Sequence, residues 1–216
     1  VEHLLLDQLL DRLSPNERAE ARDVLLSHFG APSSEDRRGR VALIGLRGGG
    51  KSTLGRLLAE KLEVPFIELD RDIEKTSGMA LSELFEMFGQ QTFRRFEREA
   101  LEKALADHPR FVLATGGSLV TEPATYELLL TSCLTVWVRT KPDQHMNRVI
   151  EQGDLRPMAE NAKAMDDLVS ILKSREPLYA KADRVIDTEG KKPDQSLREL
   201  TSMIDFPKPA AERRIA

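Results

Sequence analysis

The chain contains one cysteine and no long apolar run, and both scarcities narrow the class of protein. Cys133 alone cannot form a disulfide within one chain, which favours a reducing compartment, and its apolar neighbours predict a buried core thiol. No apolar segment approaches the roughly 18 residues that cross a bilayer. No signal-like segment is present either. We therefore expect a cytoplasmic protein with no membrane partner.

An excess of positive charge is also missing. The 32 Lys and Arg residues are outnumbered by 36 Asp and Glu residues, which gives a net charge of −4. Binding to a nucleic acid needs a concentrated basic face that neutralises phosphates. We therefore expect these 216 residues to bind no nucleic acid themselves. Their number suits one α/β domain with a small addition.

A leucine-rich segment and a linker precede the main part of the chain. Six of the first 13 residues are leucines at helical spacing, and Ser14, Pro15 and Glu17 then provide a capping box and a first-turn proline. This predicts a helical hairpin over residues 1–30 and a flexible linker over 31–39. The wide apolar face predicts packing on the main domain or on a second copy, and so a homodimer; the alternative is a helix that lies only on its own domain. Because the chain opens at Val1 within a helical pattern, we expect a further part upstream.

Short β-branched runs alternate with long amphipathic stretches from residue 40 to 205. The runs are RVALIG, VPFIELD, RFVLATGG, CLTVWVRT and RVID. Such alternation predicts an α/β domain whose parallel sheet is covered by helices on both faces. Residues 206–216 are expected to form a tail.

The first of these runs ends in a phosphate-binding loop. Gly45 to Ser52 match G-x-x-x-x-G-K-[ST] between a strand and a helix. Glycines let backbone N–H groups point at phosphate oxygens, Lys51 reaches the terminal phosphates, and the Ser52 hydroxyl can bind Mg²⁺. The residues expected to hold phosphates are Gly45, Arg47, Gly48, Gly49, Gly50, Lys51, Ser52 and Thr53.

Two carboxylates end the next predicted strand. Glu68 and Asp70 are two residues apart, so on a strand both would face the carboxyl end of the sheet, where α/β proteins bind ligands. The alternative is that Asp70 only caps the following helix.

Further along, a heavily charged helix contains Phe93, Arg94 and Glu97, and a solvated, ion-paired face is the ordinary interpretation of such a helix.

The order and spacing of these residues from about 40 to 200 resemble those of the shikimate kinases. The matching stretches are GLRGGGKST, FIELDRDIEK, FRRFE, LATGGS, RPM and SREPLYAKAD. The resemblance implies a P-loop, nucleoside-monophosphate-kinase-like fold that uses ATP with Mg²⁺. It assigns catalysis to Asp70, Lys51 and Arg156, and it adds Arg148 and Arg156 to the nucleotide site. The residues that it implies for substrate or effector are Asp70, Phe85, Phe93, Arg94, Glu97, Gly116, Gly117, Ser118 and Arg175.

Three positions depart from the family pattern. Glu68 stands where the family has an aspartate near the metal, and the longer side chain shifts the carboxylate. Ser118 replaces a glycine, which would strain a left-handed turn by about 1–2 kcal/mol. Arg47 adds positive charge beside the phosphates. These departures predict ligand binding rather than efficient turnover.

A second resemblance extends over nearly the whole chain. DRLSPNERAEAR, TVWVRTKPDQHMNRV and QGDLRPMAENAKAMDDL are similar to segments of benzoyl-CoA-responsive transcriptional regulators with an upstream helix-turn-helix domain. This resemblance implies an effector domain that binds benzoyl-CoA or ATP in a kinase-like site. The regulator is our first interpretation, and an active shikimate kinase that phosphorylates the 3-hydroxyl is the alternative.

Overall fold

The computed structural model describes residues 12–14, 17, 20, 21, 24, 34–142, 145 and 164–207. The chain forms two compact units, residues 1–33 and 34–216. In the first unit, the Ser14 N–H donates to Glu17 Oε2 at 2.8 Å and the Glu17 N–H donates to Ser14 Oγ at 3.4 Å, which is the predicted capping box. Most of the predicted hairpin, together with Arg148 and Arg156, lies outside the described residues. The predicted domain boundaries and homodimer stay predictions.

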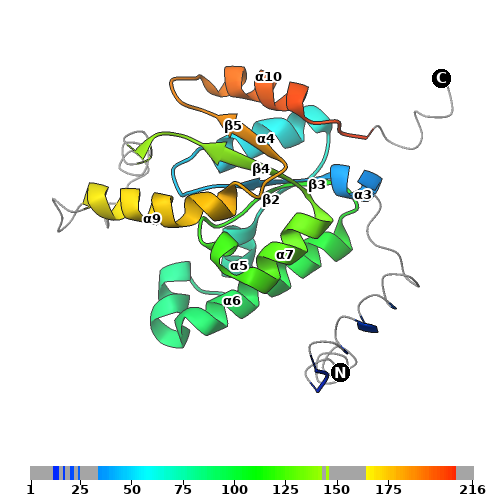
Figure 1. Ribbon diagram of the computed structural model, residues 1–216, viewed down its shortest axis with the longest axis vertical. Helices are drawn as coiled ribbons and strands as arrows, with labels where there is room; N and C mark the ends of the chain where they lie inside the picture. Colours follow the sequence, from blue (N-terminus) through cyan, green and yellow to red (C-terminus); the bar gives the residue numbers. More distant parts are fainter. Residues whose placement is uncertain are drawn as a thin grey trace. The chain divides into compact units, whose positions relative to one another are not determined.

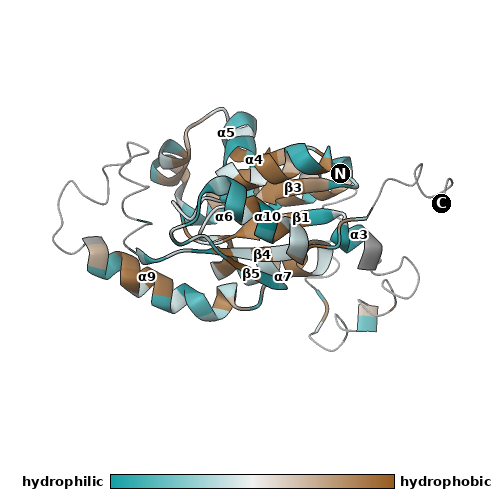
Figure 2. Cartoon of the chain, turned by 90° about the horizontal axis from the view of Figure 1, so that it is seen from above, coloured by the Kyte–Doolittle hydropathy of each residue, from teal (hydrophilic) through white to brown (hydrophobic). Residues whose placement is uncertain are grey.

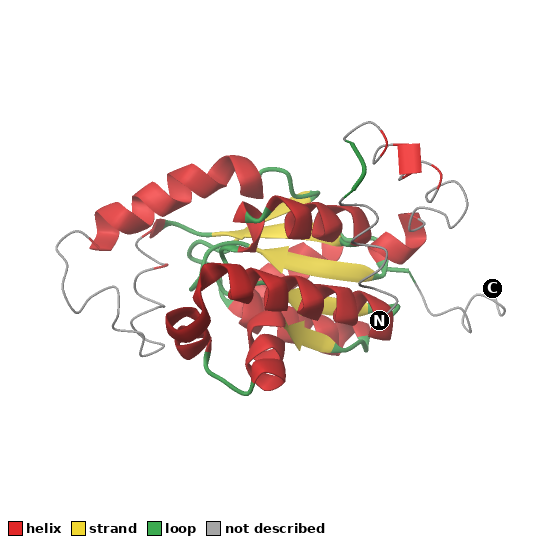
Figure 3. Ribbon diagram, turned by 90° about the horizontal axis from the view of Figure 1, so that it is seen from below, coloured by secondary structure: helices red, strands yellow, loops and turns green. Residues whose placement is uncertain are grey.

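Five parallel strands form the sheet of the second unit, in the order β2-β3-β1-β4-β5. Their bounds are β1 Arg40–Ile44, β2 Phe66–Glu68, β3 Phe111–Ala114, β4 Leu134–Arg139 and β5 Arg184–Asp187. The three strands β3, β1 and β4 are buried along almost their whole length because helices cover them on both sides (Figure 3). The predicted P-loop, kinase-like α/β fold is confirmed.

Eight helices surround the sheet within the described residues (Figure 1). They are α3 Ser34–Arg38, α4 Lys51–Leu62, α5 Leu69–Ser77, α6 Leu81–Asp107, the 3₁₀ helix η1 Leu119–Thr121, α7 Pro123–Ser132, α9 Ala164–Tyr179 and α10 Pro193–Met203. Hydrophobic and hydrophilic residues alternate along α9, as expected for a helix with one face on the protein (Figure 2). No helix of the described segments is long and apolar enough to cross a membrane.

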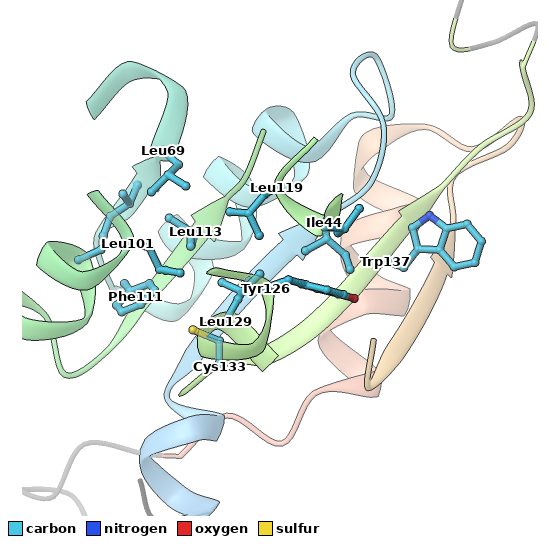
Figure 4. Close-up of a cluster of buried hydrophobic side chains, with 14 of the residues drawn as sticks. Ile44, Leu69, Leu101, Phe111, Leu113, Leu119, Tyr126, Leu129, Cys133 and Trp137 are labelled. Carbon is cyan, nitrogen blue, oxygen red and sulfur yellow. The ribbon is translucent and has the colours of Figure 1, made fainter. Parts of the chain in front are cut away.

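Side chains alternate along the strands and build one core on each face of the sheet. Ala42 and Ile44 pack with residues of α6 and α7, in a cluster that includes Leu101, Phe111 and Leu129 (Figure 4). Val41 and Leu43 point to the other face and pack with α4 and α10. Cys133 is fully buried in the first core, as predicted.

The second strand is shorter than predicted. The sequence VPFIELD was expected to be extended throughout, but β2 ends at Glu68 and α5 begins at Leu69, whose side chain is fully buried. The strand alternation therefore does not reach Asp70, which lies in the first turn of α5. The carboxylates of Glu68 and Asp70 have different surroundings as a result.

Candidate active site

The phosphate-binding loop connects β1 to α4 at the carboxyl end of the sheet. Gly48 and Gly50 have φ values of 78° and 92°, which favour glycine. At Gly45 a Cβ atom would lie 2.5 Å from the Val138 carbonyl oxygen, so the loop also needs glycine to pass close to β4. The loop conformation thus depends on the glycines of the motif.

Lys51 is folded back onto this loop. Its Nζ donates to the carbonyl oxygens of Gly45 at 2.7 Å and Leu46 at 2.9 Å. Burial lowers the pKa of the ammonium to about 8, although the nearby Asp70 carboxylate opposes this shift. A phosphate that binds here would replace the two carbonyl groups as the partner of Lys51.

One cavity of about 480 Å³ joins the loop to Asp70 and Glu74 of α5. Most of its lining comes from residues that the sequence singled out, namely Arg47, Gly48, Gly50, Lys51, Ser52, Thr53, Asp70, Phe85 and Gly117. Burial raises the pKa of Asp70, while the charges of Lys51 and Arg47 oppose the shift. The cavity therefore brings a partly buried carboxylate and a buried ammonium to the same space.

Gly116 lies beside two carboxylates. A Cβ atom at this position would lie 2.8 Å from Asp70 Oδ1 and 3.5 Å from Glu97 Oε1. The absence of a side chain at Gly116 is what allows Asp70 to occupy its place. Gly116 is among the residues that the kinase resemblance implied for substrate, and its lack of a Cβ permits this close approach.

Arg94 and Glu97 form a buried ion pair on α6. Arg94 Nη1 donates to Glu97 Oε2 at 2.6 Å, and Arg94 Nη2 donates to Thr121 Oγ1 at 3.1 Å. Glu97 is fully buried, and its Oε1 has no hydrogen-bond partner among the described residues. Burial raises the pKa of Glu97 to about 7, against the influence of Arg94. The solvated-face interpretation is wrong for Glu97, because its carboxylate is fully buried beside Gly116, in the turn after β3.

The two aromatic residues of the site contact each other. The rings of Phe85 and Phe93 stack with centroids 4.3 Å apart. Phe93 is 3% exposed and Phe85 is 40% exposed, so only Phe85 offers a broad face to the cavity. The structure thus brings Phe85 and Phe93 together, but Phe93 lies inside the core.

Arg175 and Tyr179 hold the turn after β3. Arg175 Nη1 donates to the Gly117 carbonyl oxygen at 3.0 Å, and the Tyr179 hydroxyl donates to the same oxygen at 2.7 Å. Sequence reasoning missed Tyr179 as well as Thr121. Tyr179 had a signal, because it follows Arg175 by four residues and therefore shares its helix face.

Glu68 and Ser118 depart from the family pattern, and the structure does not show the effects that we expected from either. The Glu68 carboxylate is paired with Arg71 at 2.9 Å and Arg56 at 3.5 Å, and it does not line the cavity. Ser118 has φ −96° and ψ −7°, a right-handed conformation, so the expected left-handed strain does not arise. Within the described residues, no group of three or more His, Cys, Asp and Glu side chains can hold a metal ion.

A parallel sheet with this strand order, a P-loop after its central strand and a cavity that joins the loop to Asp70 define a P-loop kinase of the nucleoside-monophosphate-kinase type. The family model described as shikimate kinase matches residues 47–205. The chain therefore belongs to the shikimate kinase family.

Individual relatives agree with this assignment. The chain is 33% identical to a shikimate kinase of Paramagnetospirillum magneticum over 82% of this chain and 90% of that protein. It is 36% identical to a shikimate kinase of Moorella thermoacetica over 75% and 92%. The structure of shikimate kinase from Acinetobacter baumannii in complex with shikimate superimposes with a TM-score of 0.68 and 31% identity, over 76% of this chain and 92% of that chain.

The comparisons correct our first interpretation of the sequence. The chain is not supported as a benzoyl-CoA-sensing effector domain of a helix-turn-helix regulator, because the matching family model and these relatives are shikimate kinases. Two of the three segments that suggested the regulator, TVWVRTKPDQHMNRV and QGDLRPMAENAKAMDDL, lie within the residues that the kinase model matches. The family match also gives no support to our expectation of inefficient catalysis.

Proposed function

We propose that this chain is a shikimate kinase that transfers the γ-phosphoryl group of ATP to the 3-hydroxyl of shikimate. The observation that carries this proposal is the single cavity shared by Lys51, Ser52 and Asp70. Phosphoryl transfer is catalysed mainly by positioning and charge stabilisation, and this cavity holds groups suited to both. Family membership supports the same reaction.

The loop side of the cavity suits the nucleotide. Backbone N–H groups of the glycine-rich loop and the start of α4 would surround the phosphates, and Lys51 would neutralise charge as it develops. ATP reacts as its Mg²⁺ complex, and the metal neutralises the phosphate oxygens. The Ser52 hydroxyl lines the cavity and would hold Mg²⁺, whereas Glu68 does not fit this role because two arginines occupy its carboxylate.

The opposite side of the cavity suits an alcohol that attacks phosphorus. As the hydroxyl oxygen bonds to the γ-phosphorus, the bond to the β–γ bridging oxygen breaks, and ADP leaves. The hydroxyl proton passes to Asp70, whose raised pKa suits it to accept a proton. Arg94 and Arg175 are proposed to hold the shikimate carboxylate; Arg175 contacts the Gly117 carbonyl oxygen, and Arg94 contacts Thr121 in η1.

Steady-state kinetics of two α5 variants tests this assignment. Asp70→Asn removes the proton acceptor at nearly constant size, and we expect kcat to fall by at least about 100-fold. Asp72→Asn changes an exposed carboxylate in the same helical turn and should leave kcat unchanged. Equal activity of the two variants would refute the role of Asp70.

A further inference from the structure

Two buried side chains, His145 and Thr188, contact the phosphate-binding loop without lining the catalytic cavity. His145 follows β4 in the chain and is almost fully buried. Its Nδ1 is 3.0 Å from the carbonyl oxygen of Arg47. Its Cε1 is 3.4 Å from the position that a Cβ atom at Gly49 would occupy. The imidazole ring therefore packs directly against the loop, where this glycine leaves room for it.

The contact between His145 and Arg47 determines which ring nitrogen carries hydrogen. A carbonyl oxygen only accepts hydrogen bonds, so Nδ1 must be the protonated nitrogen and must donate. The Thr188 hydroxyl makes a longer contact, since its Oγ1 is 3.4 Å from the carbonyl oxygen of Gly49 and 3.2 Å from that of Arg139. Side-chain donors thus face the carbonyl groups of two alternate residues of the loop.

The orientation of these carbonyl groups determines where the N–H groups of the loop point. In a trans peptide unit, the C=O and the N–H that follows it lie in one plane and point in opposite directions, and the part of the chain that the structure describes contains no cis peptide bond. A donor that holds the Arg47 carbonyl group therefore directs the Gly48 N–H away from His145. The Gly49 carbonyl group is related to the Gly50 N–H in the same way. Gly48 and Gly50 line the catalytic cavity, whereas Gly49 between them does not.

We propose that His145 is a positioning residue for nucleotide binding, because its Nδ1–H holds the Arg47 carbonyl group and so directs the Gly48 N–H at a bound phosphate. This rests on the proposed function only in requiring that the loop binds the phosphates of a nucleotide. Three successive glycines give the loop little conformational preference of its own, since glycine adopts positive and negative φ values with similar ease. His145 supplies that preference from outside the motif.

Three substitutions separate this hydrogen bond from simple packing. His145→Leu keeps an apolar side chain of similar bulk and removes the donor. His145→Asn is smaller, but its amide group can donate from nearly the position of Nδ1. A packing role favours Leu over Asn, whereas a positioning role favours Asn over Leu. The matched control is His108→Leu, because His108 follows α6 and precedes β3 at the opposite end of the parallel sheet.

Residual dipolar couplings measure the orientation of backbone N–H groups in the full chain without any ligand. We expect His145→Leu to change the coupling of Gly48 and to leave the couplings of α4 unchanged, which also shows that the variant is folded. His145→Asn should restore the wild-type coupling, and His108→Leu should not alter it. An unchanged Gly48 coupling in His145→Leu, or an Asn variant that behaves like the Leu variant, would overturn the proposal.

Calorimetric titration with ADP tests the consequence for binding. The dissociation constant should rise roughly threefold to tenfold in His145→Leu and return to within about twofold of wild type in His145→Asn, because one hydrogen bond is lost and then regained. A changed Gly48 coupling with unchanged ADP affinity would show that His145 does not position the nucleotide. A wild-type chain that binds no ADP would overturn the proposed function, and the Gly48 coupling would still decide whether His145 orients the loop.

Discussion

Lys51 is the residue whose titration most directly affects nucleotide binding. Burial lowers its pKa to about 8 in the free protein, so half of the molecules carry a charged Lys51 at that pH and nearly all do only at about one pH unit below it. Above pH 8, a phosphate can use Lys51 only after the amine takes up a proton. We therefore predict that ADP affinity falls as pH rises from 7 to 9, by at most about tenfold per pH unit above the pKa. Calorimetric titrations at several pH values measure this slope.

The variant Lys51→Ala is the matched control for that slope. It should bind ADP about 10-fold to 150-fold more weakly at pH 7, because one charge-assisted contact is lost. Its affinity should also change much less between pH 7 and 9. A variant that kept the wild-type pH dependence would show that a different group titrates.

Gly116 and Ser118 make a second prediction at the residue scale. Gly116→Ala would place a methyl group 2.8 Å from Asp70 Oδ1, so the carboxylate must move, and a shift of about an ångström lowers kcat by roughly 100-fold.

Ser118→Gly relieves no strain, because Ser118 has a right-handed backbone conformation. It should leave kcat unchanged and cost about 0.4–1 kcal/mol in the free energy of unfolding. A gain in activity from Ser118→Gly would contradict the observed turn.

Single residues were predictable where chemistry is local, and less so where it depends on packing. The motif placed Lys51 and Ser52 in the cavity because a P-loop has one conformation. The surroundings of Glu97 depend on which face of α6 meets the sheet, and charge composition alone pointed the wrong way. The hydroxyl contacts of Thr121 and Tyr179 depend on residues 27 and 62 positions away in the chain.

At the scale of the elements, the kink in α6 is the feature with the clearest energetic consequence. Gly89 interrupts the helix with φ 75° and ψ 175°, a conformation that is nearly exclusive to glycine. Gly78, the C-cap of α5, has φ 71° and ψ 13°, which other residues adopt at lower cost. At both positions an added Cβ meets no atom within 4 Å, so the two sites differ only in backbone conformation.

We predict that Gly89→Ala lowers the free energy of unfolding by about 1–3 kcal/mol. Gly78→Ala should lower it by only about 1 kcal/mol, since left-handed strain is smaller. Urea denaturation of both variants measures the difference. Equal losses would show that the helix accommodates a non-glycine residue by straightening at Gly89.

The elements themselves followed closely from periodicity, and their boundaries followed less well. The strands predicted near residues 40, 111, 134 and 184 are all present. The exception is VPFIELD, where the alternation of large residues continues past the point at which the helix begins. Burial of Leu69 under α6 decides that boundary, and this tertiary contact has no counterpart in local sequence.

At the scale of the whole molecule, the sequence predicted the layered α/β fold but favoured the wrong function. Alternating strands and helices require a parallel sheet with two covered faces, and β1 indeed contributes to a separate core on each side. Function depends on the site rather than on the fold, and segments that mostly lie within the residues matched by the kinase family model were taken for those of a regulator. The cavity geometry and the family match restore the kinase assignment.

The most direct test of this assignment is ³¹P NMR of the purified chain mixed with ATP, Mg²⁺ and shikimate. The account predicts a new phosphomonoester signal that grows in step with the ADP signals, and it predicts that Asp70→Asn slows this growth by at least about 100-fold. ATP that stays intact, or that yields only ADP and inorganic phosphate in the presence of shikimate, would contradict the proposed function.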